Sequence, residues 1–140
     1  MTEPLSRIDA RNCFVCGPDN PIGLKIEFHV EGDHCHGRFR SRPEHVGFDG
    51  VTHGGIIFAV LDDAMANWFF LQGARGYTAK AAIRYRNEMP VGKDVEIRCE
   101  VLKRKGRLVQ LSARIFAGDE TYAESEASFM LEDFGQLDRP

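Results

Sequence analysis

The order of two hydrophobic periodicities limits how this chain can fold. Residues 53–71 form one long apolar run with the spacing of a helix, and Gly73 and Gly76 follow it as stop signals. Beyond this run, apolar residues recur at every second position, which is the pattern of half-buried strands. The alternating segments are residues 78–86, 94–102, 107–116 and 121–131.

Two more alternating segments precede the helix. Residues 24–30 and 34–40 flank a turn at Gly32-Asp33, which predicts a hairpin. The chain is then two strands, one long helix and four strands. An antiparallel sheet of about six strands with the helix buried against one face satisfies this order, so the predicted class is α+β. The side chains predicted to face the core are Leu24, Ile26, Phe28, Val30, Ala79, Ala81, Ile83, Tyr85, Val95, Ile97, Cys99, Val101, Val109, Leu111, Ala113, Ile115, Ala123, Ser125, Ala127, Phe129 and Leu131.

Length and composition indicate one domain. The chain has 140 residues, of which 43% are hydrophobic and 28% are charged, and this suffices for one buried core. We expect residues 1–23 to form an extended N-terminal segment, residues 24–132 the folded domain, and residues 133–140 a loose tail.

Charge and hydropathy exclude several classes of partner. The net charge of −3 argues against nucleic acid, which usually leaves a basic surface on its partner. The apolar run at 56–71 is shorter than the ~20 residues of a membrane span and contains two acids. The N-terminus "MTEPLSRIDA" lacks the apolar core of a signal peptide, so the four cysteines are expected to be reduced thiols in the cytoplasm.

Three stretches of the sequence resemble a known family. "HGGIIFAVLDDAM" opens the helical run and places an acid, Asp62, nine residues after His53. "TAKAAIRYRNEMPVG" begins on Thr78 and ends in a Pro-x-Gly turn, and "CFVCGPDNPIGLKIEF" lies near the N-terminus. Together they resemble the PaaI-like acyl-CoA thioesterases, which have the hotdog fold: a curled antiparallel sheet wrapped around one central helix. The resemblance covers nearly the whole chain and implies hydrolysis of an acyl-CoA to the free acid and coenzyme A.

The start of the helical run is suited to binding a thioester carbonyl. N–H groups at a helix start lack intrahelical partners, and the helix dipole is positive there. Glycine at positions 54 and 55 lets a ligand oxygen approach the backbone, so Gly54, assisted by Gly55, is predicted to be the oxyanion donor. Alternatively, the two glycines only allow the helix to pack closely.

Asp62 is the predicted catalytic acid. It lies among apolar residues about two turns into the helix, and it could attack the thioester or deprotonate a water molecule. A carboxylate that caps nearby backbone N–H groups is the alternative. Asp63 points about 100° away around the helix and is expected to be structural or solvent-facing.

The resemblance implies two helpers and leaves one role open. Thr78 corresponds to a hydroxyl that bonds the catalytic carboxylate or its water, and His53 at the helix N-cap orients the carbonyl or shapes the turn. Many relatives hold the water with an Asn or Gln six or seven residues before this His, where this chain has Val46 and Gly47. His45 and Asp49 are the candidates to replace it.

Substrate contacts are predicted at two places. The hairpin "KRKGR" collects Lys103, Arg104, Lys105 and Arg107, which are either a solvated turn or a seat for the phosphates of coenzyme A, reinforced by Arg84 or Arg86. Phe58 flanks the proposed site from the helix.

A Cys13-x-x-Cys16 motif allows a zinc site, but the sequence favours a packed loop. It has no second CxxC, and alternation puts His34 and His36 on the face opposite Cys35. We therefore expect no metal and no cofactor.

The active site is predicted to be shared between subunits. Gly54 and Asp62 are eight residues apart, about 12 Å along one helix, whereas both must reach one carbonyl. A two-fold homodimer, alone or within a dimer of dimers, with antiparallel helices would bring Gly54 of one subunit to Asp62 of the other. Two other functions are compatible with the same fold and are the alternatives to thioester hydrolysis. They are a hotdog dehydratase or hydratase, and a non-catalytic acyl-CoA binding protein.

Overall fold

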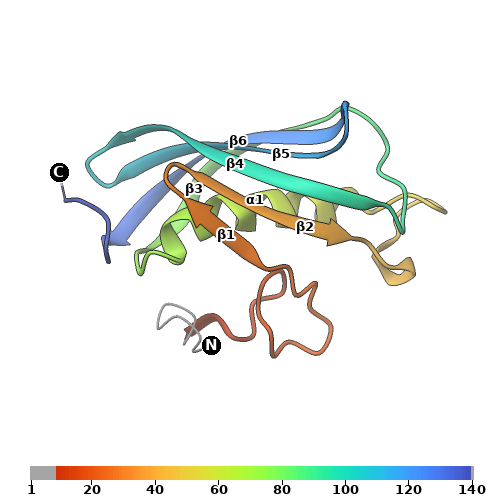
Figure 1. Ribbon diagram of the computed structural model, residues 1–140, viewed down its shortest axis with the longest axis horizontal. Helices are drawn as coiled ribbons and strands as arrows, with labels where there is room; N and C mark the ends of the chain where they lie inside the picture. Colours follow the sequence, from red (N-terminus) through yellow and green to blue (C-terminus); the bar gives the residue numbers. More distant parts are fainter. Residues whose placement is uncertain (1–8, 140) are drawn as a thin grey trace.

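The computed structural model describes residues 9–139, so the expectations for residues 1–8 and 140 lie outside it. Six antiparallel strands form one sheet in the order β1-β2-β4-β5-β6-β3, and this sheet curves over a single helix (Figure 1). The elements are β1 (Phe28–Glu31), β2 (His34–Arg40), the short 3-10 helix η2 (Pro43–His45), α1 (Gly54–Phe70), β3 (Arg75–Tyr85), β4 (Asp94–Lys105), β5 (Leu108–Ala117) and β6 (Glu120–Asp133). The predicted α+β class and strand count are confirmed.

Helix α1 begins and ends at the residues that its sequence indicates. His53 is the N-cap and Leu71 the C-cap. Gly73 then adopts a φ of +83°, a left-handed conformation that glycine adopts without steric cost. At 17 residues α1 is shorter than the ~20 residues of a membrane span, and none of the described helices is long and apolar enough to cross a membrane.

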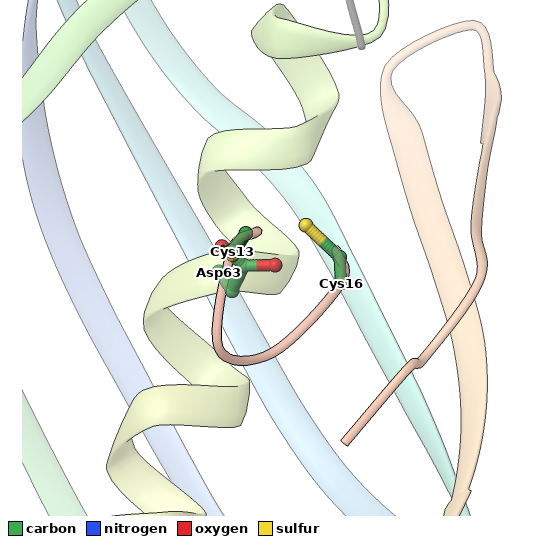
Figure 2. A group of neighbouring side chains, drawn as sticks. All are labelled: Cys13, Cys16 and Asp63. Atoms are coloured by element: carbon green, nitrogen blue, oxygen red, sulfur yellow. Dashed lines mark hydrogen bonds between the residues drawn. The ribbon is translucent and has the colours of Figure 1, made fainter. Parts of the chain in front are cut away.

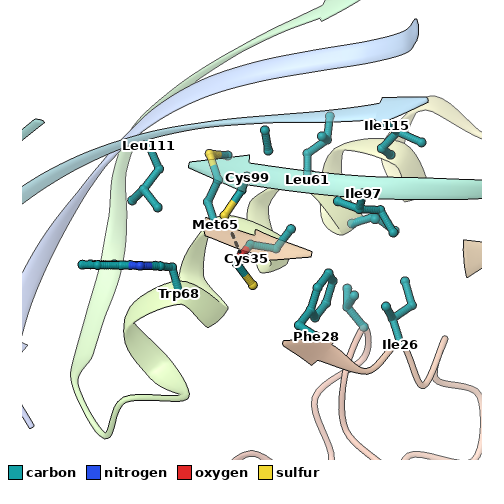
Figure 3. Packing of buried hydrophobic residues seen from close by; sticks show 14 of the residues in the cluster. Ile26, Phe28, Cys35, Leu61, Met65, Trp68, Ile97, Cys99, Leu111 and Ile115 are labelled. Carbon is teal, nitrogen blue, oxygen red and sulfur yellow. Dashed lines mark hydrogen bonds between the residues drawn. The ribbon is translucent and has the colours of Figure 1, made fainter. Parts of the chain in front are cut away.

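The core lies between α1 and the concave face of the sheet. Leu61 and Met65 are fully buried on the helix, and they face Ile97 of β4 and Leu111 of β5 (Figure 3). The Trp68 indole N–H donates to the carbonyl of Gly32 at 2.9 Å, which fastens the helix to the β1–β2 turn. These contacts fix the position of the helix relative to the sheet, and with it the positions of the acidic side chains Asp62 and Asp63.

Strand β3 departs from strict alternation. The pairing of β3 with β6 shifts register between Thr78 and Lys80, so Ala79 is an extra, bulged residue. The prediction that Ala79 faces the core with Ala81 and Ile83 is wrong, because Ala79 is exposed whereas the other two pack against the core. The bulge instead turns Thr78 toward the helix.

The segment before β1 is not simply extended. Among residues 9–23 the chain makes successive turns, and Val15 and Cys16 are buried in the core. Leu24 and Ile26 are buried as predicted, but their N–H groups donate to the carbonyls of Phe14 and Val15 rather than to a neighbouring strand. The ladder of β1 therefore starts at Phe28. The N-terminal loop lies below the helix, on the side away from the sheet (Figure 1).

The C-terminal residues also contact the domain. Phe134 and Leu137 pack against the core, and the N–H of Gln136 donates to the carbonyl of Gln72 at 2.8 Å. The residues predicted as a loose tail are thus fastened, at least as far as Leu137, beside the C-terminal end of α1.

Candidate active site

The first turn of α1 leaves one backbone donor free. The Gly55 N–H donates to Nδ1 of His53 at 2.8 Å, and the N–H groups of Ile56 and Ile57 both donate to the His53 carbonyl. Among the described residues nothing accepts from the Gly54 N–H. The Gly54 N–H is therefore available to a ligand, whereas the N–H of Gly55, predicted to help bind substrate, is already used by the N-cap.

A groove of about 660 Å³ opens beside this free donor. It runs between the start of α1 and the end of β3, and its lining includes Phe48, His53, Gly54, Tyr85, Arg86 and Met89. The Tyr85 hydroxyl donates to the Gly54 carbonyl at 2.8 Å. The sequence placed Tyr85 on the inner face of its strand but gave no sign that it fixes the first turn of the helix.

Asp62 lies further along α1, facing strand β3. The Thr78 hydroxyl donates to Asp62 Oδ1 at 2.7 Å, as the resemblance implied. Burial raises the pKa of Asp62, and the hydrogen bond from Thr78 acts in the opposite direction by stabilising the carboxylate. The bulge at Ala79 makes this contact, since strict alternation along β3 would put Thr78 and Ala81 on opposite faces. Bulges often redirect a side chain next to a functional site.

The free donor and the acid do not meet within one chain. Gly54 and Asp62 are eight residues apart on one straight helix, about 12 Å by helical rise. Asp62 does not line the groove beside Gly54. The two groups thus lie at separate positions along α1.

Strand β3, which carries Thr78, forms one edge of the sheet. Only β6 pairs with it among the described strands, so its other backbone edge has no strand beside it. Tyr77 and Tyr85 are 53% and 51% exposed on this strand. A long exposed edge strand with large apolar side chains is a surface that natural proteins usually cover.

Asp63 is not solvent-facing. Its Oδ1 accepts a hydrogen bond from the Cys13 thiol at 3.5 Å, and its Oδ2 accepts from the Asn67 amide at 2.9 Å. Burial is the main reason that the pKa of Asp63 rises to about 7. The structural interpretation of Asp63 holds, but the solvent-facing one is wrong. The sequence gave no sign of its contact with Cys13, because the two residues are 50 positions apart.

The basic hairpin lies far from Gly54 in the same subunit. Arg104 donates to the carbonyl of Asp138, and Arg107 donates to that of Leu131 at 2.7 Å. The hairpin is thus next to the C-terminal residues, which contact the end of α1 opposite to Gly54 (Figure 1). Lys103 and Lys105 are exposed there.

The other predicted substrate contacts are dispersed. Arg84 is exposed and lines a separate hollow with Arg98 and Arg114. Arg86 pairs with Glu124 yet lines the groove at Gly54. Phe58 is half-buried on α1. Of these three side chains, the structure brings only that of Arg86 to the groove.

His45 and Asp49, the two residues predicted to hold the attacking water, both lie outside the groove at Gly54. His45 is buried, its Nδ1 accepts from the Arg42 N–H, and its Nε2 has no partner among the described residues. Asp49 is exposed in the loop before the helix. Neither side chain lines the groove at Gly54.

Comparison with known proteins identifies the family of this chain. The model of a family described as Thioesterase superfamily matches residues 49–124, which is more than half of the chain and includes α1 and β3. This chain belongs to the thioesterase superfamily. The resemblance to hotdog-fold thioesterases is thereby confirmed.

Individual relatives share the fold over much of this thioesterase-superfamily chain. It is 34% identical over 91 residues to the acyl-coenzyme A thioesterase THEM4 of Xenopus laevis, a match that covers 64% of this chain but 40% of that protein. A crystal structure described as a thioesterase superfamily protein superposes with a TM-score of 0.76 at 23% identity, covering 86% of this chain and 60% of the other. The thioesterase protein of Streptococcus pneumoniae TIGR4, solved with coenzyme A, superposes with a TM-score of 0.72 at 16% identity, covering 81% and 88%.

Proposed function

We propose that this protein hydrolyses an acyl-CoA thioester to the free acid and coenzyme A. The observation that carries the proposal is the Thr78–Asp62 hydrogen bond on a helix whose first turn keeps the Gly54 N–H free. An acid held by a hydroxyl can serve as base or nucleophile, and a free N–H at a helix start can stabilise an oxyanion.

In this proposal each residue has one task. The Gly54 N–H binds the thioester oxygen and stabilises the negative charge that develops on it. Asp62 either removes a proton from a water molecule that attacks the thioester carbon, or attacks that carbon itself to form an acyl anhydride that water then hydrolyses. In both routes the carbon–sulfur bond breaks, the thiolate of coenzyme A leaves and takes up a proton, and the acyl group ends as the free acid. Thr78 holds the Asp62 carboxylate, and His53 fixes the turn that presents Gly54.

The Streptococcus pneumoniae relative supports the choice of Asp62 and Thr78. Structures of that protein were solved with single alanine substitutions of an aspartate and of a threonine sixteen residues later. Asp62 and Thr78 are separated by the same sixteen residues. The coenzyme A in another structure of that protein supports an acyl-CoA as substrate.

We further propose that two subunits share each active site. Pairing of two β3 edges about a two-fold axis would cover Tyr77 and set the two α1 helices antiparallel, so Gly54 of one subunit would approach Asp62 of the other. This arrangement would cover the exposed edge of β3. It would also bring together a donor and an acid that lie ~12 Å apart along one helix. Whether two such dimers associate further, and whether the protein is cytoplasmic, stay predictions from the sequence.

The test is release of free thiol from a panel of aromatic, short-chain and medium-chain acyl-CoA thioesters. We expect turnover of at least one class, and loss of it in Asp62→Asn, which keeps the shape of the side chain and removes its charge. Asp119→Asn, at an exposed turn, is the matched control and should keep full activity. Retention of more than about one hundredth of kcat in a folded Asp62→Asn protein would exclude its role, since removal of a reacting group usually costs at least 10²-fold.

A further inference from the structure

We propose that Cys13, Cys16 and Asp63 bind a thiolate-preferring divalent cation, with Zn²⁺ as the natural candidate. The sequence alone favoured a metal-free loop, because no further ligand with suitable spacing was visible. The structure supplies the third ligand from α1. This inference is independent of the proposed hydrolysis.

The three side chains converge with distances that suit one ion. Their ligand atoms, two sulfurs and a carboxylate oxygen, all lie within 4.8 Å of one another. Cys13 Sγ and Asp63 Oδ1 are 3.5 Å apart. Tetrahedral zinc with Zn–S near 2.3 Å and Zn–O near 2.0–2.2 Å places its S and O ligands about 3.5 Å apart and two S ligands about 3.8 Å apart. Small side-chain movements would therefore complete the geometry.

The loop is shaped to present both cysteines to the helix. Figure 2 shows the segment with Cys13 and Cys16 lying across α1 at Asp63. Its turn is closed by the Gly17 N–H, which donates to the Cys13 carbonyl at 2.9 Å. A Cβ at position 17 would come within 2.2 Å of the Cys13 backbone nitrogen, so only glycine fits.

Asn67 orients the carboxylate of Asp63 through hydrogen bonds from its side-chain amide. Its amide donates to Asp63 Oδ2 at 2.9 Å and to the Asp63 carbonyl at 2.8 Å, and it lies 3.7 Å from the Cys16 sulfur. These bonds occupy Oδ2 and leave Oδ1 facing Cys13. Ligands of metal ions are usually held by such outer hydrogen bonds.

The donor set favours zinc over harder cations. Two thiolates and one carboxylate suit Zn²⁺, whereas Mg²⁺ and Ca²⁺ prefer oxygen ligands alone. A water molecule would fill the fourth position. Binding would release the thiol protons and tie the N-terminal loop to the middle of α1. The histidines considered from the sequence are not part of this group: His34 lies beside Glu100, and the ring of His36 contacts that of His29 at a tilt.

The test is metal content and metal-dependent spectroscopy of the full chain, purified under reducing conditions. We expect one equivalent of zinc per chain. After removal of zinc with a chelator, Co²⁺ should give the intense sulfur-to-cobalt absorption and the visible bands of a tetrahedral thiolate site. Cys13→Ser, Cys16→Ser and Asp63→Asn should each lower the affinity for Zn²⁺ at least tenfold in competition with a chelating dye.

Two controls separate this site from fold and from catalysis. Cys99→Ser alters a buried thiol elsewhere and should bind zinc normally. Asp62→Asn should keep the full equivalent of zinc although it is expected to be inactive, so the two proposals can fail separately. Circular dichroism checks that each variant is folded. Less than a tenth of an equivalent of zinc with no cobalt spectrum, a Cys13–Cys16 disulfide in the reduced preparation, or unchanged affinity in folded Asp63→Asn would each overturn the proposal.

Discussion

The Thr78 hydroxyl donates to Asp62 Oδ1 at 2.7 Å, and this contact joins the central helix to the exposed edge of the sheet. The two residues are sixteen positions apart in the sequence and lie on different elements, and a β-bulge at Ala79 makes their contact possible. The catalytic proposal and the proposed dimer therefore depend on the same strand, β3.

Removal of the Thr78 hydroxyl should slow turnover without preventing binding. We expect Thr78→Val to lower kcat about 10- to 100-fold with little change in KM, because a hydrogen bond to a charged group contributes about 1.5–3 kcal/mol. Thr78→Ser should recover most of the rate, since it restores the donor. Steady-state kinetics on the best acyl-CoA measures both parameters.

The control for this variant is Thr121→Val, which removes a hydroxyl from β6 outside the site and should leave kcat unchanged. If Thr78→Val and Thr121→Val have equal kinetics, Thr78 does not position Asp62. If Thr78→Ser is as slow as Thr78→Val, the hydroxyl is not the relevant group.

The fold was predictable because α1 and strands β4, β5 and β6 show regular helical or alternating patterns of apolar residues. Strands β4, β5 and β6 bury Ile97, Leu111 and Phe129 at the positions that alternation gives, and α1 begins one residue after His53 as expected. Alternation is a local property, so a single sequence carries it.

The features of the site that the sequence did not indicate depend on irregular backbone or on contacts between distant positions. The bulge at Ala79 adds one residue to one strand, and nothing in "TAKAAIRYR" indicates where. The contact of Cys13 with Asp63 spans 50 positions, and the Tyr85–Gly54 bond spans 31. Such contacts depend on how elements pack, which periodicity does not determine.

The buried face of α1 should determine stability. Leu61 is fully buried against the sheet, so Leu61→Ala should lower the free energy of unfolding by about 2–5 kcal/mol. Leu102→Ala is the matched control, because Leu102 is 48% exposed and its truncation should cost less than about 1 kcal/mol. Urea unfolding followed by circular dichroism measures both. Equal losses would show that α1 is not packed as described.

The lysines of the β4–β5 hairpin test the predicted seat for coenzyme A. Lys103 and Lys105 are exposed, whereas Arg104 and Arg107 bind backbone carbonyls, so only the lysines can be replaced without loss of structural contacts. If they bind the phosphates, Lys103→Gln with Lys105→Gln should raise KM for acyl-CoA about tenfold, equivalent to 1.4 kcal/mol. KM for a truncated thioester without the nucleotide should not change. Equal KM values for wild type and variant on acyl-CoA would leave the hairpin as a solvated turn.

The shared site can be tested with two inactive variants. Gly54→Pro removes the free N–H at the first helical position, where proline is tolerated, and the preceding His53 already has the extended ψ of 134° that proline requires. Gly54→Ala is its control: the added Cβ would lie 3.4 Å from the Tyr85 hydroxyl, an ordinary contact, and the N–H is kept. Asp62→Asn removes the acid. We expect Gly54→Pro and Asp62→Asn each to be inactive alone, and Gly54→Ala to be active.

Mixing the two inactive variants then distinguishes the models. In a heterodimer with shared sites, one site holds both defects and the other holds an intact Gly54 and an intact Asp62, so a fully exchanged mixture, half of it heterodimer, should recover about a quarter of wild-type activity. If each site lies within one subunit, every site carries a defect and mixing restores nothing. The measurement is thiol release after subunit exchange, with heterodimers quantified by native mass spectrometry. Confirmed heterodimers without activity would exclude the pairing of Gly54 with the acid of the second subunit.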